Sequence, residues 1–263
     1  MKAQKNHTLN FYVFSSNITV IEKLMQIGKV CAIIIEKRQL SQEIVNISNL
    51  WDIQLHYADT LPELHPAFMN ICDNSIGISF GSGFIFKNMH INAFTHGIIN
   101  FHTGKLPENR GRPPIAWSFY HCDKYFYLTS HRINEKIDQG EKIIERKIFR
   151  SITDTTQTII NKISAELQGD FIEKTLSALF QNKTKTLQKG NYHPATANKF
   201  NSIQRADYTA KQIFSIFKSQ THYGNVIVDG NEYKRCEFYN SDISYTGSYD
   251  LITIDNETLI LFK

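Results

Sequence analysis

The chain has 263 residues, of which 41% are hydrophobic, and this length and composition are typical of one large folded core with a smaller appendage. Lysine and arginine exceed acidic residues by a formal net charge of +4 without a long basic block, so charge alone does not indicate nucleic-acid binding. The four cysteines are dispersed without zinc-site spacing, and no apolar run is long enough to be a signal core or membrane span, so we expect reduced thiols in a cytoplasmic protein.

Apolar strands alternate with amphipathic segments through the first part of the chain. Strands are predicted at 9–14, 29–36 and 53–57, with helices between them around 20–27 and 41–51. Such alternation indicates parallel βαβ units. We therefore predict an α/β fold: a Rossmann-like, mostly parallel sheet flanked by helices, with a small C-terminal α+β appendage.

Glycine marks one strand end and is missing from another. The first strand-to-helix turn, 14–18, has no glycine, so its backbone cannot approach a pyrophosphate and a dinucleotide cofactor is not expected. A fourth predicted strand begins at Ile76, and the loop that leaves it contains Gly81 and Gly83. These glycines permit a flat ligand to approach the backbone closely, although they suit a plain bend equally well.

A second candidate site lies at the end of the predicted strand that begins at Ile98. Asn100 and His102 lie at the end of this predicted strand, and residues two apart on a strand point to the same face. Ligands bind at strand ends in open α/β sheets, so this amide and imidazole are candidates for a functional site. Taken by themselves, they favour a structural role, because a lone buried histidine is usually structural.

Further strands are predicted at 125–133 and 142–149, with Asp138 on the turn between them. Asp154 is predicted to cap one long helix that continues past Gly169, and 181–199 reads as a polar linker.

The C-terminal part is predicted to contain a helix at 208–218 and strands at 226–228, 233–239 and 251–262. Hairpin turns are expected at Asp229-Gly230 and Asp255-Asn256. We place a main domain at 1–185, and a linker with a small helix and hairpin region at 186–263.

Three motifs occur in a characteristic order. Asn100-x-His102 followed by Leu-Pro-x-x-Arg-Gly at 106–111 resembles the signature of the folate-dependent formyltransferases, and Asp138 stands 36 residues after His102, the interval of that family's catalytic aspartate. The resemblance covers roughly residues 8–180. Thr103 and Lys105 depart from the family's usual proline and leucine, and these departures bear on the substrate more than on the chemistry.

The resemblance implies roles for these residues and makes 1–185 the catalytic domain. Asn100 would stabilise an oxyanion, His102 would act as general base, and Asp138 would orient and charge-stabilise the imidazole. The formyl donor would be 10-formyltetrahydrofolate, and no metal is implied. The pterin pocket would be lined by Gly83, Phe84, Ile85 and Phe86.

The acceptor is inferred from the C-terminal part. Short appendages of this kind resemble those of nucleotide-sugar N-formyltransferases, whereas methionyl-tRNA formyltransferases carry a larger C-terminal barrel. We expect formyl transfer to the amine of a dTDP- or GDP-linked deoxy sugar for surface polysaccharide such as O-antigen, by a homodimer without nucleic-acid or membrane partners. Arg110, Arg112 and Tyr192 are candidates to hold the nucleotide or its diphosphate, although such residues are often plain surface or packing residues.

Three alternatives stay open. The chain could formylate methionyl-tRNA, it could hydrolyse formyltetrahydrofolate to release formate, or it could be a non-catalytic module that binds a folate or a nucleotide sugar.

Overall fold

The computed structural model describes residues 8–68, 70–195, 200–221 and 223–263, and the chain divides into two compact units. Unit 1 comprises the chain up to Arg110 together with Leu128–Arg146 and Ser164–Gly190, and unit 2 comprises Gly111–Tyr127, Lys147–Ile163 and Asn191–Lys263. The units therefore interleave along the sequence. The predicted boundary between 185 and 186 stays a prediction, and part of the predicted linker, 196–199, lies outside the described residues.

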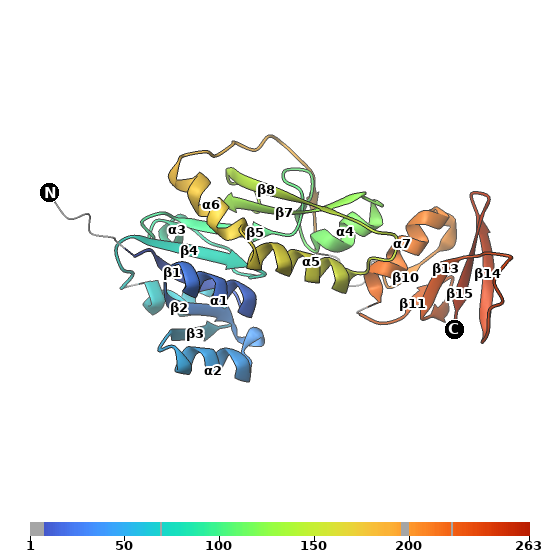
Figure 1. The fold of residues 1–263 in the computed structure, drawn as a ribbon, viewed down its shortest axis with the longest axis horizontal. Helices are drawn as coiled ribbons and strands as arrows, with labels where there is room; N and C mark the ends of the chain where they lie inside the picture. The colour runs from blue at the N-terminus through green and yellow to red at the C-terminus, as the bar shows by residue number, and fades with distance from the viewer. Residues whose placement is uncertain (1–7, 69, 196–199, 222) are drawn as a thin grey trace. The chain divides into compact units, whose positions relative to one another are not determined.

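A mostly parallel sheet confirms the predicted fold class (Figure 1). Among the described residues it contains seven strands in the order β3 (Gln54–Ala58), β2 (Lys29–Glu36), β1 (Asn10–Phe14), β4 (Ser75–Phe80), β5 (Ile98–His102), β7 (Tyr125–Arg132) and β8 (Lys142–Phe149). The strands from β3 to β5 pair in parallel, whereas β5 pairs antiparallel with β7. The predicted strands at 29–36 and 142–149 match β2 and β8 to the residue.

The helices begin where polar side chains can cap them. Asn17, Ser41 and Thr209 each accept a hydrogen bond from a main-chain N–H in the first turn of α1, α2 and α7. The described helices are α1 (Ile18–Ile27), α2 (Gln42–Leu50), α3 (Asn88–Ile91), α4 (Pro114–Tyr120), α5 (Thr156–Gln168), α6 (Phe171–Phe180) and α7 (Ala210–Gln220), with 3-10 turns at Lys37–Gln39, Leu61–Phe68 and Arg205–Asp207.

The prediction of one long helix after Asp154 is wrong. The chain leaves the helix at Gly169 and Asp170, so that α5 and α6 are separate helices. The predicted cap is also wrong, because the Asp154 carboxylate accepts from Ser151 N and Thr158 Oγ1, whereas Thr155 Oγ1 accepts from the main-chain N–H of Thr158. The apolar stripe continues from α5 into α6, and the sequence pattern therefore predicts a single helix.

Short strands form the C-terminal part of unit 2. Both predicted hairpin turns are confirmed: Asp229-Gly230 joins β11 to β12, Asp255-Asn256 joins β14 to β15, and all four residues have positive φ. One described sheet has the order β10 (Ser202–Ile203), β11 (Val226–Val228), β12 (Asn231–Tyr233). A second has the order β13 (Arg235–Phe238), β15 (Glu257–Phe262), β14 (Tyr249–Ile254). A two-stranded sheet pairs β6 (Arg110–Gly111) with β9 (Tyr192–His193).

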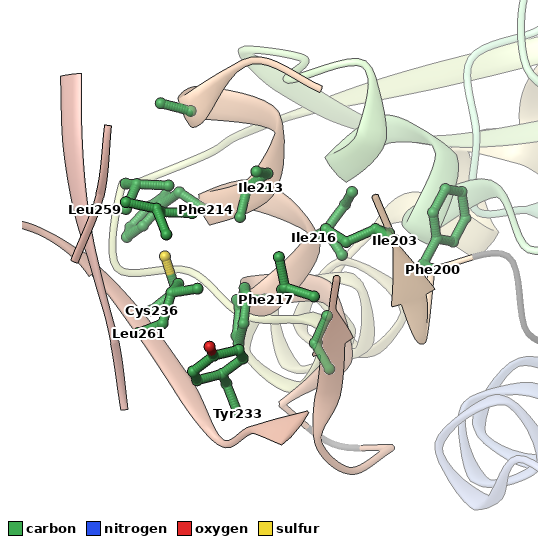
Figure 2. Packing of buried hydrophobic residues seen from close by; sticks show 14 of the residues in the cluster. Phe200, Ile203, Ile213, Phe214, Ile216, Phe217, Tyr233, Cys236, Leu259 and Leu261 are labelled. Atoms are coloured by element: carbon green, nitrogen blue, oxygen red, sulfur yellow. The ribbon is translucent and has the colours of Figure 1, made fainter. Parts of the chain in front are cut away.

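Each unit has an apolar core of its own. In unit 1, Tyr12 and Phe14 of β1 pack with Phe84, Phe86 and Ile98. In unit 2, the buried face of α7 packs against side chains of the small sheets, as Figure 2 shows for Phe217, Tyr233 and Leu261 among others. Unit 2 therefore has a core that the predicted small appendage alone would not supply, because Trp117 of α4 belongs to it.

We expect Phe217→Ala to lower the free energy of unfolding by about 3–5 kcal/mol, because the ring is 2% exposed and its removal leaves a cavity. Ile227→Ala is the control, since that side chain is 38% exposed on β11 and should cost about 1 kcal/mol or less. Urea denaturation of the two variants measures the difference; equal losses would contradict this account of the core.

Candidate functional site

The end of β5 carries two of the predicted site residues. Asn100 is partly buried and His102 is 6% exposed, and both lie on the strand next to β7. The antiparallel register pairs Asn100 with His131 and His102 with Thr129. A histidine that sequence reasoning left without a role is thus held directly beside the predicted amide.

His131 sets the orientation of the Asn100 amide. Its Nδ1 lies 2.8 Å from the carbonyl oxygen of Arg132, which can only accept, so Nδ1 carries the proton in the neutral ring. Its Nε2 is then an acceptor and lies 3.1 Å from Asn100 Nδ2. The amide of Asn100 therefore directs one N–H to His131 and has its second N–H for another acceptor.

Asp138 joins this group from the turn between β7 and β8. Its Oδ1 lies 3.7 Å from His102 Nδ1 and 3.4 Å from His131 Nε2, and its side chain is 12% exposed. Asp138 has a positive φ of 51°. Gly140 makes the turn possible, because a Cβ there would overlap the carbonyl oxygen of Arg132, the same atom that accepts from His131. The structure thus brings Asn100, His102 and Asp138 together around His131.

His102 is held in one tautomer by the loop that follows it. Its Nε2 lies 2.7 Å from the carbonyl oxygen of Asn109, so Nε2 donates and Nδ1, the atom nearest Asp138, is the basic nitrogen. Burial lowers the pKa of His102, His131 adds to this lowering, and the Asp138 carboxylate and the Asn109 carbonyl oppose it. The net direction is downward, so the ring is neutral at pH 7 and can accept a proton.

The same loop is fastened to its surroundings at several points. Thr129 Oγ1 donates to the carbonyl oxygen of Gly104 at 2.7 Å, and Lys142 Nζ donates to that of Leu106 at 3.2 Å. Arg110 is buried, and its guanidinium donates to the carbonyl oxygen of Gly190. The role predicted for Arg110 in binding a phosphate stays a prediction, and the observed contact gives it a part in holding the loop.

The segment after β4 alternates between core and surface. Phe84 and Phe86 are buried in the core of unit 1, whereas Ile85 between them is 52% exposed. Gly83 approaches the carboxylate of Glu36, which accepts its N–H at 2.8 Å, and Arg38 pairs with the same carboxylate. The main-chain groups of Ile85 and Phe86 make no hydrogen bond to any other described residue.

Two predicted substrate residues lie in unit 2. Arg112 is exposed, and Tyr192 on β9 is 52% exposed. The next residue, His193, stacks on Trp117 with ring centroids 4.4 Å apart, and its carbonyl oxygen accepts from the N–H of Arg112. Arg112 and Tyr192 thus both adjoin His193, whose ring stacks on Trp117.

Sequence reasoning missed His131, Asn109 and Glu36. His131 is separated from Asn100 by 31 positions, and only the register of β5 on β7 shows that they meet. Asn109 acts through its carbonyl oxygen, which residue type does not reveal. The available signal was a polar residue at or next to the end of a strand: Glu36 is the last residue of β2, and His131 is the last but one of β7.

Other features of the described chain add no further candidate site. A hollow of about 340 Å³ between β8 and α6 is lined by Arg146 and Lys174 among others, but these cations are paired with Glu166 and Asp170. Within the described ranges, no cluster of histidine, cysteine and carboxylate residues is arranged to hold a metal ion. None of the described helices combines the length and apolar character needed to cross a membrane.

Comparison with known proteins gives matches of two kinds. Residues 81–175 match the family described as formyl transferase. The methionyl-tRNA formyltransferase of Thermosynechococcus vestitus is 32% identical over 113 residues, which is 43% of this chain and 32% of that protein. The chain thus spans about a third of the length of the curated relatives it matches.

Two structural matches cover nearly the whole chain. The sugar 3N-formyl transferase WlaRD, solved in the presence of dTDP and 5-N-formyl-THF, has a TM-score of 0.73 at 18% identity, with 97% of each chain covered. An N-formyltransferase from Helicobacter canadensis, in complex with folinic acid and dTDP-3-aminofucose, has a TM-score of 0.72 at 16% identity, covering 97% of this chain and 98% of that one. The resemblance to the folate-dependent formyltransferases is thus confirmed: residues 81–175 match the formyl transferase family, and the chain has the fold of solved sugar N-formyltransferases.

Proposed function

We propose that this protein transfers a formyl group from 10-formyltetrahydrofolate to the amino group of a nucleotide-linked amino deoxy sugar. The observation that carries the proposal is the convergence of the Asn100 amide, the His102 imidazole and the Asp138 carboxylate within unit 1. An amide donor, a neutral base and a carboxylate are what acyl transfer to an amine requires. The folate, when bound, supplies an activated formyl group.

Asn100 stabilises the charge that develops on the formyl oxygen. One of its N–H groups is held by His131, so the second has a defined direction, and a donor with a defined direction costs no reorganisation when the oxyanion forms. Losing one such donor typically raises a barrier by about 2.7–4 kcal/mol.

His102 accepts the proton of the attacking amine at Nδ1. The Asn109 carbonyl holds Nε2–H, which leaves Nδ1 as the base, and the Asp138 carboxylate at 3.7 Å favours the imidazolium that results. Orientation of the ring therefore comes from Asn109, and Asp138 acts through its charge on the reacting side. Sequence analysis gives Asp138 two roles, to orient the imidazole and to stabilise its charge. In this proposal Asn109 takes the first role and Asp138 keeps the second.

The Gly83–Phe86 segment fits a flat heterocycle with donors and acceptors at its edge. Phe84 and Phe86 anchor it in the core, Ile85 is exposed, and the main-chain groups of Ile85 and Phe86 lack partners among the described residues. We therefore assign the pterin ring of the folate to this segment. Gly83 allows the close packing of this segment on Glu36, where a Cβ would lie 2.6 Å from Oε1.

The fold supports an amino sugar as acceptor. Structural similarity to the sugar N-formyltransferases covers 97% of this chain, whereas the methionyl-tRNA enzymes match over less than half of it. Exposed Arg112 and Tyr192 would bind the diphosphate and stack on the base. We further propose a cytoplasmic homodimer that serves surface polysaccharide synthesis, including O-antigen.

Purified protein, incubated with 10-formyltetrahydrofolate and a panel of dTDP-, GDP- and UDP-amino sugars, should produce an N-formyl sugar detectable by mass spectrometry. His102→Ala should lower kcat by about 10²–10⁴-fold because the base is lost, whereas His56→Ala on β3 should not.

Formylation of initiator methionyl-tRNA alone would establish the second candidate, which the curated relatives favour. Formate release without any acceptor would indicate a hydrolase, and folate or sugar binding without turnover would indicate a non-catalytic module.

His131→Leu should lower kcat by about tenfold or more with little change in KM, because Asn100 loses the acceptor that orients its amide. His131→Asn should keep more activity than His131→Leu, since its side-chain oxygen can accept from Asn100. Steady-state kinetics of the two variants measure this split. A rise in KM at constant kcat in both would contradict a positioning role.

The imidazole of His102 should titrate below pH 6.5 in an NMR experiment, and the acid limb of the rate should follow it, because burial disfavours the imidazolium. Asp138→Asn should lower the pKa further, since the carboxylate that favours the charged ring is removed. His56, whose pKa is lowered by burial alone, should keep its value in this variant. A higher His102 pKa in Asp138→Asn would overturn this electrostatic account.

A further inference from the structure

Two cysteines lie near the amino ends of the central strands, opposite to the end of β5 that carries Asn100 and His102. Cys31 is on β2, Cys72 precedes β4, and β1 lies between these two strands in the sheet. The register pairs Phe11 with Val30 and Tyr12 with Ala32, so it shifts at Cys31, as it does at a bulge in one strand.

The bulge allows Cys31 to share a face with Tyr12. Cys31 and Ile71 both pack against the core cluster that contains Tyr12 and Ala32. The segment that carries Cys72 therefore crosses the same face of the sheet toward which the Cys31 thiol is directed.

Two side chains of β1 connect both cysteine segments. The Cys31 thiol donates to Asn10 Oδ1 at 3.6 Å, and Asn10 Nδ2 donates to the carbonyl oxygen of Asp73 at 2.7 Å. The main-chain N–H of Cys72 donates to the Tyr12 hydroxyl at 3.0 Å. The Cys72 side chain is close enough to the Cys31 thiol to contribute to the raised pKa of that thiol. Both cysteine segments are thus tied to neighbouring side chains of β1.

The two thiols differ in accessibility. Cys72 is exposed and Cys31 is partly buried. Burial, with a smaller contribution from Cys72, raises the pKa of Cys31, and burial raises the pKa of Tyr12 to about 12. An oxidant in solution therefore reaches Cys72 first, and Cys31 is the neighbour that can respond.

We propose that Cys31 and Cys72 form a reversible intramolecular disulfide when the protein meets a peroxide. The Cys72 thiolate attacks a peroxide oxygen, giving a sulfenic acid and one water, and the Cys31 thiolate then attacks the Cys72 sulfur and releases a second water. Two thiols and one hydrogen peroxide thus give one disulfide and two waters. A thiol reductant reverses the reaction, as is typical of redox-responsive disulfides in a reducing compartment.

The disulfide would join β2 to the segment before β4 across β1, and it would close a loop within unit 1. Closing a loop constrains the unfolded chain, so the oxidised protein gains thermal stability. Formyl transfer is expected to be retained, because Asn100 and His102 lie at the other end of the parallel strands.

The test uses the full-length reduced protein, treated with hydrogen peroxide, alkylated and digested without reductant. A peptide that joins Cys31 to Cys72, lighter than the sum of its parts by two hydrogen atoms and lost on dithiothreitol treatment, is the expected product. The melting temperature of the oxidised wild type should rise by several degrees, whereas Cys72→Ser should show no rise. In Cys31→Ser, dimedone should trap the Cys72 sulfenic acid that the missing partner cannot resolve.

Cys122 and Cys236 are the matched internal controls. Cys236 is 1% exposed, and burial raises its pKa to about 12, so its thiol should be protected and still be alkylated after unfolding. Cys122 is partly buried and lies in unit 2, away from the segments of Cys31 and Cys72 in unit 1, and it should also still be alkylated. Overoxidation of Cys72 in the wild type while Cys31 stays fully alkylatable would overturn the proposal. A cross-link from Cys72 to Cys122 or Cys236 would overturn it as well.

Discussion

The antiparallel pairing of β5 with β7 is the constraint on which the site depends. It places Asn100 opposite His131 in a part of unit 1 where buried polar groups require partners. Because His131 Nδ1–H donates to the Arg132 carbonyl oxygen, the other nitrogen of the neutral ring accepts, and the Asn100 amide is turned toward it. The turn after β7 then brings Asp138 to the same place, and Gly140 allows that turn to pack against Arg132. One strand register thus sets a donor, a base and a charge relative to one another.

The pKa of His102 is set by effects that oppose one another. Burial and the neighbouring His131 disfavour the imidazolium, whereas Asp138 and the Asn109 carbonyl favour it, and the first pair prevails. A ring that is neutral at rest but has a carboxylate close to its basic nitrogen can take a proton and have the resulting charge stabilised at once. This combination suits a reaction in which an amine loses its proton as it attacks.

The central sheet separates two kinds of chemistry by strand polarity. Parallel strands place their carboxyl ends together, and the proposed folate segment after β4 and the proposed catalytic residues of β5 lie at that edge. The proposed cysteine pair lies near the amino ends of β2 and β4, which the formyl-transfer chemistry does not use. The same strand order therefore permits a redox response in unit 1 that leaves Asn100, His102 and Asp138 untouched.

Several features were predictable from sequence because they depend on short-range patterns. The bounds of β2, β8 and β11 follow apolar runs, and the hairpin turns follow Asp-Gly and Asp-Asn pairs. The spacing of Asn100, His102 and Asp138 singled these residues out, together with a likeness to a family. Only the tertiary structure decided which groups touch them. His131, the Asn109 carbonyl and the buried state of Arg110 depend on strand register and on loop packing between residues far apart in the chain, as does the break between α5 and α6, where one apolar stripe spans two helices. Local patterns carry no information about such contacts, because the partner's position is set by the fold rather than by neighbours in sequence.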